Sequence, residues 1–297
     1  MPEQITNLPQ EDSNYGLVVD SEPCVDEELE AECEHLDNLL VGYDSILSRE
    51  VLDAGSVTGS EQYTLTTLRL HGVSGMEALD GLKNAAKVVY ETIMATLGKI
   101  KDFFFGDGKK NAEEAENRAD EALENLAKLD GNIPLPDNAG VLEEDKYMNK
   151  VKQDEKLAKL LSDHPNLKTV YDKLTTSISR IKNSKTVANI GAAYQVVITD
   201  TKAALAAVQR ELNTAVSDAE KAAKVVQNPK EVKPDDPAEI KQSIKEEHKQ
   251  HTAEAKEKTA AAQMLGSAQT KLTSLLNTVS NGISSIGSSK PKSAFKG

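Results

Sequence analysis

Apolar residues recur in steps of three and four over much of this chain. One such run joins Leu79, Leu82, Ala86, Val89, Ile93, Leu97, Ile100 and Phe104, and a longer one extends from Ile190 to Ala219. An α-helix has 3.6 residues per turn, so this spacing places the apolar side chains on one helix face. The pattern therefore predicts amphipathic helices over 79–104 and 190–219.

Shorter patterns predict further helices between and beyond these two. An Ala and Leu stripe occupies 112–129, and apolar faces over 157–161 and 167–181 are separated by Pro165. A last helix begins near Ala238 and gains its apolar face only from Leu265 onward. Glycine favours helix ends, so we expect Gly106 and Gly108 to end the first amphipathic helix.

These elements predict an all-α protein, an elongated helical bundle or a set of coiled-coil-like helices. Its narrow apolar seams are rich in small residues, which suits antiparallel helices and leaves little room for a ligand pocket. The predicted divisions are an acidic arm 1–77, an amphipathic helix 78–108, a helical bundle 109–227, a linker 228–237, a C-terminal helix 238–288 and a basic tail 289–297.

The arm differs sharply from the rest of the chain in charge. Residues 1–77 hold 17 acidic and 2 basic residues, a net charge of −15, whereas residues 78–297 hold 31 acidic and 33 basic residues, a net charge of +2. Such an asymmetry indicates a segment with its own role. Apolar residues from Leu29 to Leu40 predict one short helix, and the alternation in 62–70 indicates an extended segment or weak strand. We expect the arm to be largely disordered otherwise.

Motifs that carry chemistry are absent from the sequence. There is no phosphate-binding loop, no H-E-x-x-H and no G-x-S-x-G. His248 and His251 lie three residues apart beside Glu247, a spacing that can bind a metal, but a solvated helix face is the favoured interpretation. We therefore predict no enzymatic activity and no catalytic, cofactor-binding or metal-binding residues.

Three consecutive phenylalanines, Phe103, Phe104 and Phe105, end the first amphipathic run. Three neighbouring side chains cannot share one face of an α-helix, so at least one is expected to be exposed or packed in a turn. These residues are candidates for contact with a partner protein or with a membrane surface, beside the simpler interpretation of a bundle helix with a buried stripe. No apolar stretch is long enough to predict a membrane-spanning helix, and no secretory signal is evident, so we expect synthesis in the cytoplasm.

The sequence Gly75-Met76-Glu77, followed by Ala78, lies where the acidic arm ends. Together with the amphipathic run that ends in "DFFFGDG", this layout resembles the internal head (prohead core) proteins of large tailed bacteriophages. In that family an acidic propeptide precedes a site at which the prohead protease cuts after Glu, with a small or aliphatic residue two positions earlier. Gly59-Ser60-Glu61 fits the same form less well.

The resemblance implies a non-enzymatic structural protein of the phage head interior, made in the host cytoplasm and processed after Glu77. Its implied partners are the prohead protease and capsid or scaffold proteins, with packaged DNA, a membrane surface and further copies of the chain as additional candidates. The alternative is a cytoplasmic helical adaptor, or a membrane-surface-binding protein that acts through its amphipathic helix.

Overall fold

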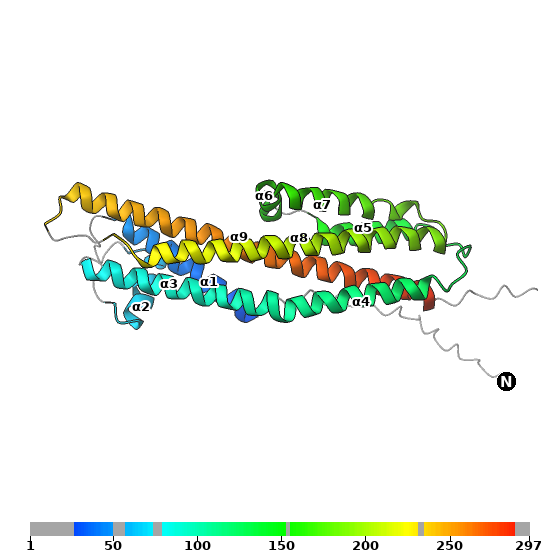
Figure 1. Ribbon diagram of the computed structural model, residues 1–297, viewed down its shortest axis with the longest axis horizontal. Coiled ribbons are helices and arrows are strands. Elements are labelled where there is room, and N and C mark those ends of the chain that lie inside the picture. The colour runs from blue at the N-terminus through cyan, green and yellow to red at the C-terminus, as the bar shows by residue number, and fades with distance from the viewer. Residues whose placement is uncertain (1–26, 50–56, 74–78, 153–154, 231–234, 289–297) are drawn as a thin grey trace, which may run out of the picture.

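The computed structural model describes residues 27–49, 57–73, 79–152, 155–230 and 235–288. Three long helical rods form the body of the molecule and lie side by side along its long axis (Figure 1). One rod joins α3 (Leu79–Lys101), the π-helical stretch η1 (Asp102–Asp107) and α4 (Gly108–Leu126). The second is α8 (Val187–Gln227), and the third is α9 (Ala238–Ser288), whose 51 residues make it about 75 Å long.

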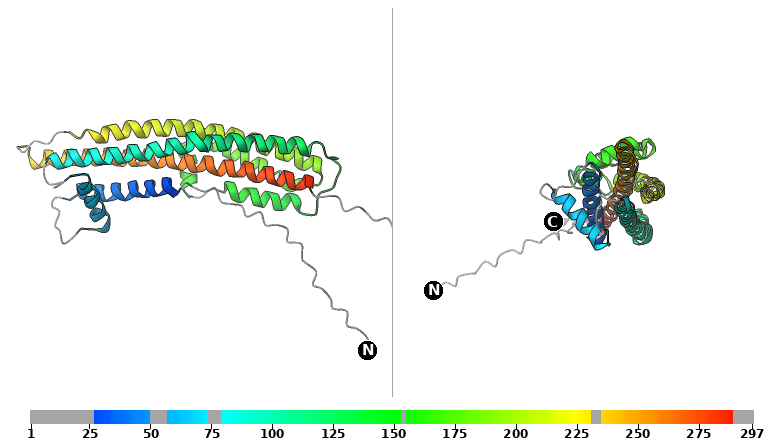
Figure 2. Two further views of the ribbon diagram at one scale, coloured as in Figure 1. Left: turned by 90° about the horizontal axis from the view of Figure 1, so that it is seen from below. Right: turned by 90° about the vertical axis from the view of Figure 1, so that its left-hand side faces the viewer.

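The rods alternate in direction, and shorter helices cover each half (Figures 1 and 2). α8 runs opposite to the other two rods. α9 lies in contact with both α8 and α4. At one end α1 (Glu27–Leu47) packs on α3 and α9, and α2 (Gly59–Leu70) packs on α1. At the other end lie α5 (Ala139–Val151), α6 (Glu155–Asp163), α7 (Pro165–Ile178) and the short turn η2 (Ile181–Asn183). The expected all-α fold is confirmed, and its shape is elongated (Figure 1).

The seams between the rods contain many small residues, which lets the helices approach closely. α4 buries Ala112, Ala115, Ala119 and Ala122 against its neighbours. α9 buries Ala255 and Ala262, and it also buries hydroxyl groups that bond within their own helix. Thr252 donates to the carbonyl of His248 at 2.9 Å, and Thr259 donates to that of Ala255 at 2.9 Å. These bonds satisfy hydroxyls that would otherwise be costly to bury.

Two sequence expectations about helix ends were wrong. Gly106 and Gly108 do not end the first amphipathic helix, because the chain passes through η1 directly into α4, and Gly108 has ordinary right-handed helical geometry. A hydrogen bond from Gln269 of α9 to the carbonyl of Phe104 supports this stretch. The preference of glycine for helix ends is therefore not enough to end the helix here. The predicted boundary between 78–108 and 109–227 therefore falls inside one continuous rod.

The arm also contains more packed structure than the single short helix that the sequence predicted. α1 is 21 residues long, and the segment expected to be extended is the helix α2. Within α2, Thr64, Thr67 and Leu68 are buried and Leu70 is exposed, which is the spacing of one helix face and not of a strand. Residues 1–26 of the arm lie outside the described part of the chain.

The π-helical stretch is held by a specific contact with α9. The ring of Phe104 lies directly over Gly266, where a Cβ atom would come within 2.1 Å of it. The side-chain amide of Gln269 donates to the carbonyl of Phe104 at 3.1 Å, which satisfies a backbone group that the wide turn makes available. Gly266 thus provides the space that the ring occupies.

We expect Gly266→Ala to destabilise the protein by about 1–3 kcal/mol, because the added methyl group displaces the Phe104 ring from a packed site. Gly98→Ala is the matched control: Gly98 also lies inside a long helix, α3, but nothing lies within 4 Å of the added Cβ. The control is expected to stabilise the protein by about 0.5–1 kcal/mol. Urea unfolding followed by circular dichroism measures both changes, and equal effects at the two sites would contradict the packing described for Phe104.

Candidate functional site

The candidate site comprises α1 and α2 of the acidic arm, the face of α3 and α9 against which α1 packs, and the junction that joins the arm to the body. Gly75, Met76, Glu77 and Ala78, the candidate scissile residues, lie outside the described residues. The structure does describe both sides of this junction. The amide of Val73 donates to the carbonyl of Leu68 at 2.9 Å, and Gly72 has a φ of +78°, so α2 ends in a glycine-based cap. α3 then begins at Leu79, so five residues, 74–78, connect the two described segments.

The weaker candidate, Gly59-Ser60-Glu61, is the first turn of α2. Glu61 is fully buried and forms a capping box with Thr58: its carboxylate accepts the Thr58 amide at 2.6 Å, and the Thr58 hydroxyl accepts the Glu61 amide at 3.3 Å. Ser45 and Arg49 of the α1 end also bond to this carboxylate, each at 2.7 Å. These bonds, the Thr58 amide above all, lower the pKa of Glu61. Glu61 therefore joins α2 to α1, and a protease would reach its peptide bond only after this turn unfolds.

A buried polar contact connects α1 to α9. The hydroxyl of Tyr43 and Nε2 of His248 lie 2.8 Å apart, and their rings meet edge to face. Tyr43 is completely buried and His248 is 2% exposed, while Nδ1 of the same imidazole has no hydrogen-bond partner. Burial, aided by the charge of His251, lowers the pKa of His248 to about 4. The imidazole is therefore neutral at pH 7.

Lysines of the body form ion pairs with acidic residues along the length of α1. Lys249 lies 3.8 Å from Asp44, Lys256 lies 3.7 Å from Asp37, and Lys99 of α3 pairs with Glu28. All three pairs are partly exposed, so each contributes at most about 1 kcal/mol. In each pair the acidic residue is on α1 and the lysine is on the body. Such pairs contribute more to the orientation of α1 on the body than to the strength of its binding.

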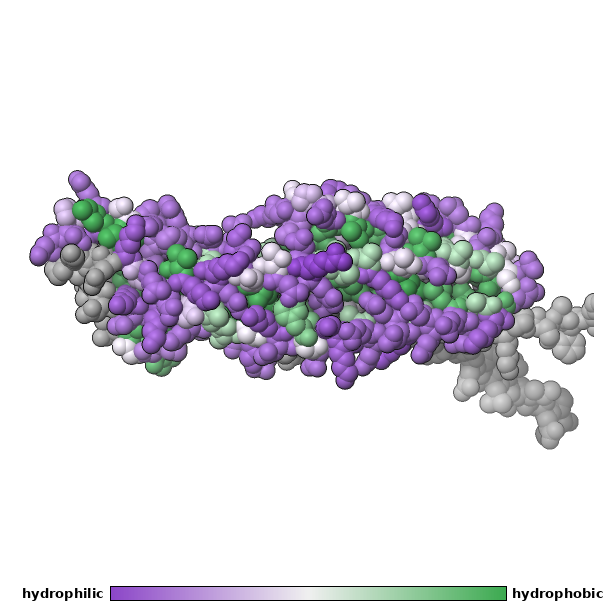
Figure 3. Space-filling model, viewed as in Figure 1, coloured by the Kyte–Doolittle hydropathy of each residue, from purple (hydrophilic) through white to green (hydrophobic). Residues whose placement is uncertain are grey.

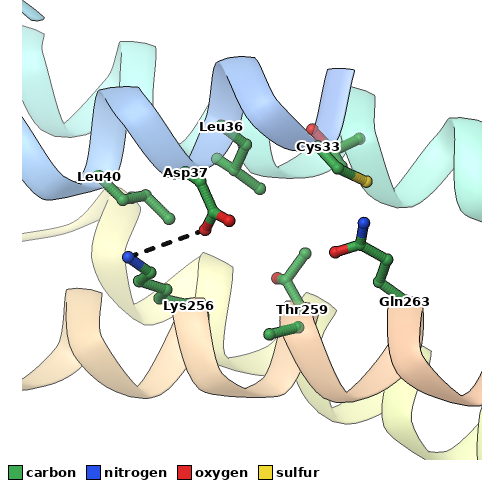
Figure 4. A pocket seen from close by; sticks show the side chains of 9 residues that line it. Cys33, Leu36, Asp37, Leu40, Lys256, Thr259 and Gln263 are labelled. Carbon is green, nitrogen blue, oxygen red and sulfur yellow. Dashed lines mark ion pairs between the residues drawn. The ribbon is translucent and has the colours of Figure 1, made fainter. Parts of the chain in front are cut away.

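A shallow depression separates α1 from α9 beside these pairs (Figure 4). Cys33 and Asp37 of α1 face Lys256, Thr259 and Gln263 of α9 across it. Its volume of about 10 Å³ is at the lower limit of the space that holds a single water molecule. Burial and nearby acidic residues raise the pKa of the Cys33 thiol to about 11, so this cysteine is a protonated, unreactive thiol at pH 7. The depression is a packing gap at the arm interface rather than a ligand pocket.

The three phenylalanines lie within the rod and not at its end. Phe104 is buried against α9, and Phe103 and Phe105 are half-buried and pack against the same core. The wide π-helical turn thus resolves the conflict that three neighbouring rings pose for a regular helix. On the face shown in Figure 3 the surface is mainly hydrophilic, and hydrophobic residues gather toward the half that carries α4, α5 and α7. Within the described residues, no helix is long and apolar enough to cross a membrane.

Other buried polar groups hold helices together in the half of the body far from the arm. Asp200 of α8 is 1% exposed and bonds to Ser177 and, at 2.7 Å, to Lys173 of α7. The hydroxyls of Tyr147 on α5 and Tyr194 on α8 lie 3.5 Å apart. Among the residues that the structure describes, no three His, Cys, Asp or Glu side chains gather in a way that could hold a metal ion.

Comparisons of the chain with protein-family models, with curated proteins and with solved structures found no match. The functional argument therefore depends on the residues and their geometry.

The sequence did not reveal the role of Tyr43 and His248. His248 was interpreted as part of a solvated helix face, yet it continues the buried stripe of α9, which includes Ile244, Thr252 and Ala255. Ile244, His248, Thr252 and Ala255 follow one another in steps of four, four and three, a spacing from which the buried face of this helix could have been predicted. Small and polar residues concealed it, because an apolar pattern does not count Thr or His as core positions.

We expect Glu61→Gln to destabilise the arm by about 1–3 kcal/mol, because a neutral amide loses the ionic bond to Arg49 and places a poorly matched polar group in a buried site. Amide hydrogen exchange of α2 and urea unfolding measure the effect. The control is Glu113→Gln on α4, where an exposed pair with Lys109 at 3.8 Å is lost and a change below about 0.5 kcal/mol is expected. Unchanged exchange in α2 would show that the capping box does not hold this helix.

Proposed function

We propose that this chain is a non-enzymatic structural protein of a phage head interior, made as a precursor whose acidic arm, residues 1–77, a prohead protease removes after Glu77. The observation that carries the proposal is the position of the Gly75-Met76-Glu77 motif. It coincides with the end of the acidic segment, and it lies in the five-residue connection between the cap of α2 and the start of α3. Scission there leaves every described helix intact.

Charge gives such a scission a physical consequence. The intact chain carries a net charge of −13, and removal of residues 1–77 leaves a body of +2. DNA is a dense array of negative charge and repels an acidic protein at close range. The processed body is close to neutral and is therefore compatible with packed DNA in a way that the precursor is not.

The arm also offers a surface for recruitment before scission. α1 buries its apolar face against the body, and Glu30 and Glu34 remain exposed on its other side. A basic patch on a capsid or scaffold protein is the complementary partner, since opposite charges across an interface accelerate and orient association. In this proposal the arm brings the precursor to the assembling shell, and its peptide link to the body is cut once assembly is complete.

The body suits a structural role. Its three rods are joined by seams of Ala, Val, Leu and Thr. A rod of this kind presents a long side surface for contacts with neighbouring molecules.

The proposal predicts that the protein in mature particles begins at Ala78. Intact-mass measurement and N-terminal sequencing of the particle-derived protein read this directly. Glu77→Gln should abolish processing, because the protease recognises the carboxylate, whereas Glu61→Gln should leave the same Ala78 terminus. A mature protein that begins at Met1 or Pro2 would refute the proposal.

A further inference from the structure

The arm is attached to the body by an extensive set of non-covalent contacts. Eight of the 21 residues of α1 are buried apolar or aromatic side chains, which are Leu29, Cys33, Leu36, Leu39, Leu40, Tyr43, Ile46 and Leu47. They pack against α3 and α9, and α2 packs on α1. The arm and the body thus share a continuous apolar core that the ion pairs of Lys99, Lys249 and Lys256 border.

We infer that the face of α3 and α9 is a binding site for the α1–α2 pair that outlasts scission of the chain, and that the Tyr43–His248 contact makes release of the arm sensitive to acid. The inference deepens the proposed function, on which it depends only for the place of the cut. Cutting one peptide bond in 74–78 removes none of the described contacts between α1 and the body.

No disulfide can retain the arm after the cut. The chain has two cysteines, Cys24 and Cys33, and both belong to the arm. Retention therefore depends on the packed interface alone, and whatever weakens that interface releases the arm.

His248 is a buried group of this interface that acid can charge. A protonated imidazole carries two N–H donors, but the site offers an acceptor only to Nε2, from Tyr43, and leaves Nδ1 buried without a partner. The neighbouring charged groups are already paired: Asp44 of α1 with Lys249, and Glu247 of α9 with Lys230. His251, the next charge along α9, opposes protonation of His248. A charge on His248 is therefore accommodated only when α1 moves away.

The direction of the pH effect follows from the two states. The pKa of His248 is about 4 with the arm in place and returns toward 6.5 when the site opens to water. Between these values the open state binds more protons than the closed state, so acid favours release, and above pH 6.5 the contact is fully stabilising. Lowering the pH from 7.5 to 5 should weaken binding of the cut arm about 30-fold.

The test uses the full chain with a recognition sequence for an unrelated site-specific protease inserted between Ser74 and Gly75. After cutting, size-exclusion chromatography and mass spectrometry show whether the arm co-elutes with the body at pH 7.5 and at pH 5. The expected result is co-elution at pH 7.5 and release at pH 5. The phage protease is not involved, so this result stands or fails independently of processing after Glu77.

Matched variants separate the role of His248 from general acid sensitivity. His248→Phe fills the same space without a titrating group and should retain the arm at both pH values. His164→Gln, which removes a histidine that bonds to Glu211 in the other half of the molecule, should release the arm at pH 5 as the unmodified chain does. Loss of the arm on cutting at pH 7.5 would overturn the persistent binding site. Release from His248→Phe at pH 5 equal to that of the unmodified chain would overturn the role assigned to His248.

Discussion

The close packing of α9 against its neighbours is the constraint on which the rest of the structure depends. α9 contacts α8 along its length, α4 at one end and α1 at the other. A helix can lie close to several partners at once only where its buried side chains are small, and its own carbonyls must then satisfy the hydroxyls that replace larger apolar groups. Ala255, Ala262 and the back-bonded Thr252 and Thr259 meet both conditions.

The same constraint explains why the arm is a distinct unit. In the half of α9 that α1 covers, the buried stripe is made of Ile244, His248 and small residues, which supply little apolar area of their own. The leucines and Tyr43 of α1 complete this part of the core. The arm thus completes the packing of one half of the body, whereas α5, α6 and α7 complete the packing of the other half.

Much of the fold could be predicted from the sequence, because the apolar spacing in the long helices is regular. The structure ends α6 at Asp163 and starts α7 at Pro165, where the sequence placed a break, and α9 covers the predicted range 238–288. The local rules failed where a distant partner decides the outcome. Gly106 and Gly108 remain helical because Phe104 is held by Gly266 and Gln269, more than 150 residues away. α2 is a helix because Glu61 is fixed by α1.

The candidate site was only partly predictable for the same reason. Charge counting placed the predicted boundary of the arm at Glu77, since net charge requires no knowledge of contacts. The buried Tyr43–His248 pair spans 205 residues of sequence, and neither residue type marks itself as a core position. Sequence patterns therefore indicated where the arm ends but not how it is attached.

The π-helical stretch determines how the buried faces of α3 and α4 are aligned along the rod. Ile100, Phe104 and Ala112 are buried, and Gly108 lies next to Gln269 of α9. These four positions follow in steps of four, and each such step advances the face of a regular helix by about 40°. The wider turn of η1 absorbs this advance, so the stripes of α3 and α4 both reach their partners. The segment Asp102–Asp107 thus holds one residue more than a regular helix would need. This extra residue keeps the buried faces of α3 and α4 on the same side of the rod.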